Sequence, residues 1–169
     1  VFKIKKNDGL RLLVLGDYLE TNTRNQMDLL VRTLVSSPVD IKIIVKPHPA
    51  CIIDPKDYPE IDIKLSSNPL QDLLRHCDLA YTGPVTSAAV DAYCCGVPVI
   101  TALDTGALNL SPLRNCDDVC FVNTSEELSE ALNSMTSRDF GPYEKKEIFT
   151  LDAELPRWKE LLLESKTYI

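Results

Sequence analysis

Short apolar runs alternate along this chain with segments whose apolar residues follow a helical period. In residues 22–34 the apolar positions Met27, Leu30, Val31 and Leu34 follow an i, i+3, i+4, i+7 spacing, which predicts an amphipathic helix. Short apolar runs of β type lie elsewhere, and each is bounded by polar, glycine or proline residues. They predict six strands, at residues 11–16, 41–45, 61–65, 78–81, 97–103 and 119–122.

Four more helices are predicted from their start and stop signals. One begins at Asn68-Pro69, with proline at the first helical position, and a small-residue helix over 85–95 ends at Gly96. A third runs to about residue 135 from a cap at Thr124 or Ser125. An amphipathic pattern around residues 156–163 predicts the last.

Strands that alternate with helices indicate an α/β fold. We expect one doubly wound domain over residues 1–169, with a mainly parallel sheet and helices on both of its faces. In such folds ligands bind at the carboxyl ends of the strands, near the point where the strand order reverses.

Composition narrows the function classes. The net charge of −7, without a cluster of Lys and Arg, argues against a nucleic-acid partner. No apolar run approaches the roughly 20 residues of a membrane span, and no secretory signal is visible. The six cysteines show no CxxC spacing, so we expect reduced, mostly buried thiols and no metal site.

Polar and conformationally special residues gather in the four loops that follow strands, which contain residues 16–17, 46–49, 82–87 and 102–114. In the third loop, Gly83 permits a close backbone approach, and the hydroxyls of Thr86 and Ser87 precede the predicted helix 85–95. Free N–H groups at a helix start attract phosphate. The same hydroxyls are equally typical of plain helix capping, so both interpretations stay open.

His48 lies between two prolines at the end of a predicted strand. The prolines restrict the backbone on both sides, and a rigid histidine there suits a hydrogen bond to phosphate or to a leaving-group oxygen. Lys46 would add a point charge or face solvent. The other histidine, His76, lies near a helix end, where a structural role is expected.

The long loop over 104–114 is a further candidate, because long loops in compact domains are often functional. Asn109, Ser111 and Arg114 are candidate contacts to a sugar or nucleotide, with Arg114 gripping phosphate or carboxylate. Simple solvation of the loop is the alternative interpretation.

Three stretches, "KPHPA" at 46–50, "YTGPVTSAAVDAYCCGVPVI" at 81–100 and "LNLSPLR" at 108–114, together resemble the donor-binding half of GT-B glycosyltransferases. The narrower resemblance is to bacterial surface-polysaccharide transferases with a His-Pro motif and a downstream Ser/Thr motif, such as sialyltransferases and Kdo transferases. One departure is that the Ser/Thr motif here is Thr86-Ser87 rather than Ser-Ser.

The resemblance implies roles for particular residues. His48 would contact the donor phosphate and stabilise the leaving nucleotide, commonly CMP or CDP, while Thr86 and Ser87 hold the same phosphate and Gly83 shapes the turn. No metal or other cofactor is implied. A glycan acceptor would bind an N-terminal domain absent from this chain, so we expect a cytoplasmic fragment, inactive alone, whose full-length protein is peripheral to the inner membrane and acts in lipopolysaccharide or capsule biosynthesis.

Three alternatives remain open at this point. A nucleotide-sugar 2-epimerase shares the fold but calls for acidic catalytic residues that the 104–114 loop does not show. A glycerophosphotransferase domain shares the two motifs. A flavodoxin-like binding module without catalytic activity is the third.

Overall fold

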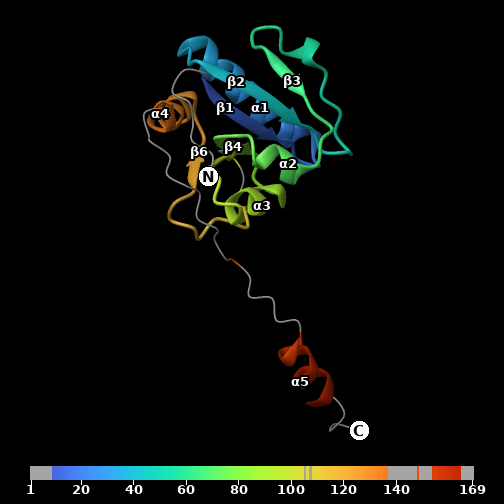
Figure 1. Ribbon diagram of the computed structural model, residues 1–169. Helices are drawn as coiled ribbons and strands as arrows, with labels where there is room; N and C mark the ends of the chain where they lie inside the picture. Colours follow the sequence, from blue (N-terminus) through green and yellow to red (C-terminus); the bar gives the residue numbers. More distant parts are fainter. Residues whose placement is uncertain (1–8, 105, 107, 137–147, 149–153, 165–169) are drawn as a thin grey trace.

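The computed structural model describes residues 9–104, 106, 108–136, 148 and 154–164. Its centre is a parallel sheet of six strands in the order β3-β2-β1-β4-β5-β6 (Figure 1). The strands are β1 (Leu10–Leu15), β2 (Ile41–Lys46), β3 (Ile63–Leu65), β4 (Leu79–Thr82), β5 (Val99–Ala102) and β6 (Cys120–Val122). This doubly wound α/β arrangement confirms the predicted fold class.

The helices follow the predicted order along the chain. They are α1 (Glu20–Ser36), α2 (Leu70–Leu74), α3 (Ala88–Cys94), α4 (Ser125–Thr136) and α5 (Pro156–Glu164), with a short 3₁₀ turn over Pro55–Asp57. Thr124 caps α4: its hydroxyl accepts from the Glu127 N–H at 3.2 Å while the Glu127 carboxylate accepts from the Asn123 N–H.

Two helix starts differ from the prediction. Pro69 is the N-cap of α2 and not its first helical residue, because its extended ψ of 140° precedes the first helical turn. Helix α3 begins at Ala88 and not at Val85, because residues 83–87 form a turn. The predicted end of α3 is confirmed: Gly96 adopts a φ of 78°, and its N–H donates to the Tyr93 carbonyl.

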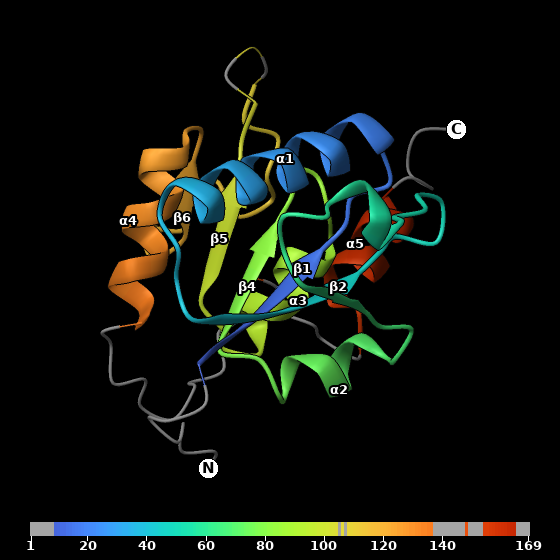
Figure 2. The ribbon, with the colours of Figure 1, turned by 90° about the horizontal axis from the view of Figure 1, so that it is seen from above.

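Apolar side chains fill a layer on each face of the sheet, and Figure 2 shows α1 on one side with α2 and α3 on the other. On the first face Met27 and Leu30 of α1 and Leu132 of α4 pack on strand residues such as Val14 and Val45. On the second face α2 and α3 cover Leu13 and Leu15 of β1. Because the central strands are buried on both faces, their sequences are mostly apolar and do not alternate.

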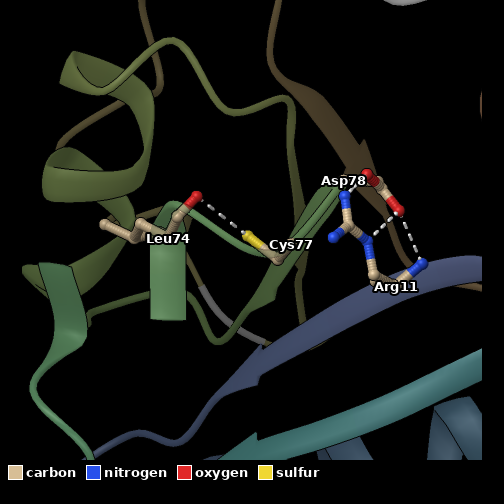
Figure 3. Close-up of polar contacts among 4 residues, drawn as sticks. All are labelled: Arg11, Leu74, Cys77 and Asp78. Carbon is tan, nitrogen blue, oxygen red and sulfur yellow. Dashed lines mark hydrogen bonds and ion pairs between the residues drawn. The ribbon is translucent and has the colours of Figure 1, made fainter. Parts of the chain in front are cut away.

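The amino edge of the sheet carries an ion pair between the start of β1 and the residue before β4 (Figure 3). The buried Asp78 carboxylate accepts from the backbone N–H and the Nε of Arg11, both at 2.9 Å, and from its Nη2. This edge lies at the opposite end of the strands from the loops predicted to bind a ligand.

The cysteines only partly match the prediction of mostly buried thiols. All six are free, but only Cys51 and Cys77 are buried, whereas Cys95 is exposed and the other three are half-buried. The Cys77 thiol donates to the Leu74 carbonyl of α2 (Figure 3). Burial raises the pKa of Cys77 to about 12. A cysteine within an apolar run is therefore not always buried, as the exposed Cys95 shows.

This burial predicts an order of thiol reactivity. Because the thiolate is the reactive form, iodoacetamide at pH 8 is expected to label Cys95 in the folded chain and to leave Cys77 unlabelled until the chain unfolds. Peptide mass spectrometry after timed alkylation measures both sites. The Cys95→Ser variant serves as the control, since it removes the exposed thiol only. Labelling of Cys77 as fast as Cys95 in the folded chain would contradict the expected burial.

The C-terminal helix α5 carries apolar side chains that do not enter the core. Trp158, Leu161 and Leu162 are each more than half exposed, and Figure 1 shows α5 away from the sheet. Within the part of the chain that the structure describes, no helix has both the length and the apolar character needed to cross a membrane.

Candidate ligand site at the carboxyl edge of the sheet

The four loops singled out in the sequence all follow parallel strands, so they begin at one edge of the sheet, here called the carboxyl edge. The strand order reverses between β1 and β4, which are paired over Leu12–Leu15 and Leu79–Thr82. The loop after β1 therefore lies between the loop after β2, which carries His48, and the turn after β4. Open α/β sheets bind ligands at such a reversal point.

The neutral His48 ring is held in one tautomer by its own loop. Its Nδ1 accepts a hydrogen bond from the Ala50 N–H at 3.1 Å, so in the neutral ring Nε2 carries the proton and is the donor. The ring is half-buried and meets the Tyr18 ring edge-on, with the two centroids 6.3 Å apart. The His48 carbonyl accepts from the Cys51 N–H at 2.9 Å. A fixed Nε2 donor suits a ligand oxygen.

Gly16 brings the end of β1 against the His48 loop. Its N–H donates to the Lys46 carbonyl at 3.0 Å, which extends the β1–β2 pairing. A Cβ at this position would lie 3.1 Å from the His48 backbone nitrogen and 3.3 Å from the Pro47 Cα. Glycine allows this approach without a shift of the His48 loop, and so the residue after β1 helps to set where His48 lies.

Lys46 uses its amine in a hydrogen bond within the protein. Its Nζ donates to the Asn68 carbonyl at 2.8 Å, in the segment between β3 and α2. The amine therefore supports a neighbouring loop. His76 has the structural role expected of it, since its Nδ1 lies 2.7 Å from the Asp72 carbonyl oxygen at the end of α2.

The turn over residues 83–87, here called the Gly83–Ser87 turn, presents hydrogen-bond donors. Ser87 is exposed, whereas Thr86 is buried and its Oγ1 accepts from the Ala88 N–H at 3.3 Å. Among the described residues, neither the N–H of Thr86 nor that of Ser87 has a hydrogen-bond partner. These two N–H groups and the Ser87 hydroxyl are the donors that the turn offers to an anion.

The 104–114 loop uses two of its three candidate side chains internally. The Asn109 Oδ1 accepts from the Ser111 N–H at 3.0 Å, and the buried Ser111 hydroxyl accepts from the Leu113 N–H at 3.2 Å. Arg114 is exposed, and one of its Nη1 hydrogens is donated to the Ser111 carbonyl at 3.3 Å. A guanidinium has five N–H donors, so Arg114 keeps capacity to bind a carboxylate or phosphate.

Two polar side chains beneath this edge were not predicted to have a role. Asp17 is fully buried and accepts from the Val85 N–H, while the Gln26 amide lies between the ends of β1 and β4. The available signals were a carboxylate directly after a buried strand and a polar residue on the buried side of α1. Both contacts join residues more than 50 positions apart in the chain, which local patterns do not encode.

Within the described residues, no group of three or more His, Cys, Asp or Glu side chains is placed to hold a metal ion. The structure thus brings His48 and the Gly83–Ser87 turn to opposite sides of the β1 loop. It bonds the Lys46 amine to the Asn68 carbonyl and leaves Arg114 exposed in the loop after β5.

Comparison with solved structures identifies the fold. The chain resembles the catalytic domain of cholesterol-alpha-glucosyltransferase from Helicobacter pylori, with a TM-score of 0.58 and 16% identity, covering 95% of this chain and 99% of that one. It also resembles the glycotransferase of kitacinnamycin, with a TM-score of 0.57 and 17% identity, covering 81% of this chain and 37% of that one. A third similar structure is the glycosyltransferase SnogD from Streptomyces nogalater, with a TM-score of 0.53 and 14% identity, covering 81% of this chain and 42% of that one.

The chain thus spans well under half the length of two of these proteins. No protein-family profile matches it, and a search of curated protein sequences gives no match. At these identities the likeness establishes the fold: a Rossmann-like half of the GT-B glycosyltransferase fold.

Proposed function

We propose that this chain is the nucleotide-sugar-binding domain of a glycosyltransferase. The observation that carries the proposal is the placement of a fixed histidine donor and a donor-bearing turn on either side of the β1 loop, at the reversal point of the sheet. The fold that the chain shares with solved glycosyltransferases supports it. In this function the phosphates of the nucleotide sugar accept hydrogen bonds from the His48 Nε2–H, from the N–H groups of Thr86 and Ser87, and from the Ser87 hydroxyl.

The chemistry required of such a domain is electrostatic. When the glycosidic bond to the leaving nucleotide breaks, negative charge develops on the departing phosphate oxygen. Donors already fixed in place stabilise this charge without reorganising during the reaction. His48 meets this requirement, because its Nδ1 is held by the Ala50 N–H and its Nε2 proton is available to the oxygen. His48 therefore acts as a hydrogen-bond donor in this proposal, and proton abstraction from the acceptor belongs to another group.

The finer assignment rests on the His-Pro and Ser/Thr motifs. We infer a cytidine nucleotide, CMP or CDP, as the leaving group, and surface carbohydrate as the class of product. The glycan acceptor would then bind a second domain that faces the carboxyl edge. These inferences draw on the motif resemblance at 46–50 and 81–100, with Thr86-Ser87 in place of Ser-Ser.

Binding of CMP, CDP and UDP to the chain tests the proposal. We expect at least one of them to shift the amide NMR signals of residues 46–50 and 82–88. His48→Ala should weaken that nucleotide's affinity about 10- to 100-fold, because a hydrogen bond to a charged group contributes about 1.5–3 kcal/mol.

His76→Ala is the matched control, since it removes the other histidine, which is exposed and bonded to the end of α2. Its nucleotide affinity should equal that of the unaltered chain. If none of the three nucleotides shifts either segment, or if the two histidine variants bind equally well, the proposed function is wrong.

A further inference from the structure

We propose that Asp17 is a positioning residue of this site, whose buried carboxylate ties the β1 loop to the Gly83–Ser87 turn and so orients the donors of Thr86 and Ser87. The effect of Asp17 on nucleotide binding rests on the proposed function. The link that Asp17 makes between the β1 loop and the turn rests on geometry alone.

Three donors from different segments converge on the Asp17 side chain, which is fully buried. Its Oδ1 accepts from the Leu19 N–H at 3.1 Å. Its Oδ2 accepts from the Asn22 side-chain amide and from the Val85 N–H, each at 3.3 Å. The carboxylate therefore links the β1 loop and the start of α1 to the turn after β4, across 68 positions of sequence.

The backbone of Asp17 is fixed as firmly as its side chain. Its N–H donates to the Thr23 Oγ1 at 2.9 Å, and the Thr23 hydroxyl donates back to the Asp17 carbonyl at 3.0 Å. Thr23 is itself buried on α1. The Asp17 backbone is thus bonded to α1, and its carboxylate is bonded to the turn. The position of the turn therefore depends on the position of α1.

Gly83 makes room for this contact. A Cβ there would lie 3.1 Å from the Asp17 Oδ2 and 3.3 Å from the Asp17 Cβ. A Cβ at this position would require the Asp17 side chain or the turn to shift by a few tenths of an ångström. The glycine predicted to serve the ligand thus also serves Asp17.

Gln26 of α1 makes a second link between the ends of β1 and β4. The Gln26 Nε2 donates to the Leu15 and Tyr81 carbonyls, and the Tyr81 hydroxyl donates to the Gln26 carbonyl at 3.1 Å. The Gln26 Oε1 is buried without a partner among the described residues, 3.6 Å from the Cβ position of Gly83. An acceptor that is buried without a partner lowers the stability of a fold.

The positioning requires a carboxylate rather than an amide. Both Asp17 oxygens accept hydrogen bonds from N–H donors. An asparagine of nearly the same size would turn its NH₂ group towards one of those donors, at either Leu19 or Val85. Asp17→Asn therefore sets an NH₂ group against one of these two N–H donors, which weakens the link between the β1 loop and the turn and leaves the packing volume unchanged.

The experiment compares Asp17→Asn with Asp78→Asn, a variant of similar chemistry at the opposite edge of the sheet. Amide hydrogen exchange of the ligand-free chain is read at Val85 and Ala88, whose N–H groups donate hydrogen bonds in the turn, and, as an internal reference, at Ile100 in β5. We expect Asp17→Asn to accelerate exchange in the turn about tenfold relative to Ile100, and to weaken nucleotide binding about tenfold. Asp78→Asn should do neither once its overall loss of stability is subtracted.

A second variant protects the test against a failure of Asp17→Asn to fold. Gly83→Ala keeps the carboxylate but displaces it, and should give the same faster exchange at Val85. Unchanged exchange in the turn for the folded variants, or equal changes in the Asp17 and Asp78 variants, would overturn the inference. If the unaltered chain binds no nucleotide, the proposed function fails, and hydrogen exchange alone decides the role of Asp17.

Discussion

Replacing Gly16 by valine is expected to lower the free energy of unfolding by about 3 kcal/mol and to abolish nucleotide binding. A Cβ on residue 16 would lie 3.1 Å from the His48 nitrogen, 3.3 Å from the Pro47 Cα and 3.5 Å from the Lys46 carbonyl oxygen. All three are backbone atoms, so no side-chain rotation relieves the contact. Relief requires the His48 loop to move off the β1 loop, which breaks the Gly16–Lys46 hydrogen bond and displaces the histidine.

Urea unfolding followed by circular dichroism measures the first effect, and titration with the nucleotide bound by the unaltered chain measures the second. Gly106→Val is the matched control, because among the described residues its Cβ position has one neighbour, the Asp104 Oδ1 at 3.5 Å, in an exposed loop. It should change stability by less than about 0.5 kcal/mol. An unfolding midpoint for Gly16→Val equal to that of the control would show that the two loops are not in contact as described.

The role of Gly16 shows where prediction from the sequence stops. The elements themselves were predictable, because burial imposes a period on apolar residues: the stripe of Met27, Leu30 and Leu34 identified α1, which packs on the sheet through these side chains. Helix α1 begins at Glu20, two residues before the predicted start, because its first two residues are polar and exposed and so add nothing to the apolar pattern. The 3₁₀ turn at 55–57 was missed, since it buries nothing.

The location of the site was predictable for the same reason. Once the strands are known, their carboxyl ends are known, and the loops with His48 and Thr86 must start there. The direction of each side chain was not predictable. Lys46 bonds to the Asn68 carbonyl and Asp17 to the Val85 N–H, and both partners are distant in sequence. Such contacts depend on which strands are neighbours in the sheet. The strand order is set by packing of the whole domain and is not encoded in local sequence patterns.

Replacing Asp78 by alanine is expected to cost about 3 kcal/mol of stability without changing the ligand site. The carboxylate accepts three hydrogen bonds from Arg11, two of them from the guanidinium and one from the backbone N–H. Its side chain is only 1% exposed, whereas the Arg11 side chain is 35% exposed. Breaking a buried pair typically costs 3–5 kcal/mol, and the partial exposure of Arg11 places this one at about the lower end.

Asp78→Ala is expected to lower stability without a loss of nucleotide binding, whereas Gly16→Val is expected to lower both. Asp78 precedes β4, so its loss weakens the joint between β1 and β4 at the amino edge, a strand length away from Asp17 and His48. Asp78→Ala should therefore unfold at lower urea concentration but bind nucleotide normally where it is folded. Glu20→Ala is the control for ion pairs as such, because its bond to Arg24 is exposed and its removal should leave the unfolding midpoint unchanged. Equal midpoints for the Asp78 and Glu20 variants would mean that the buried pair contributes no more than a surface one, and that backbone pairing and packing hold β1 to β4.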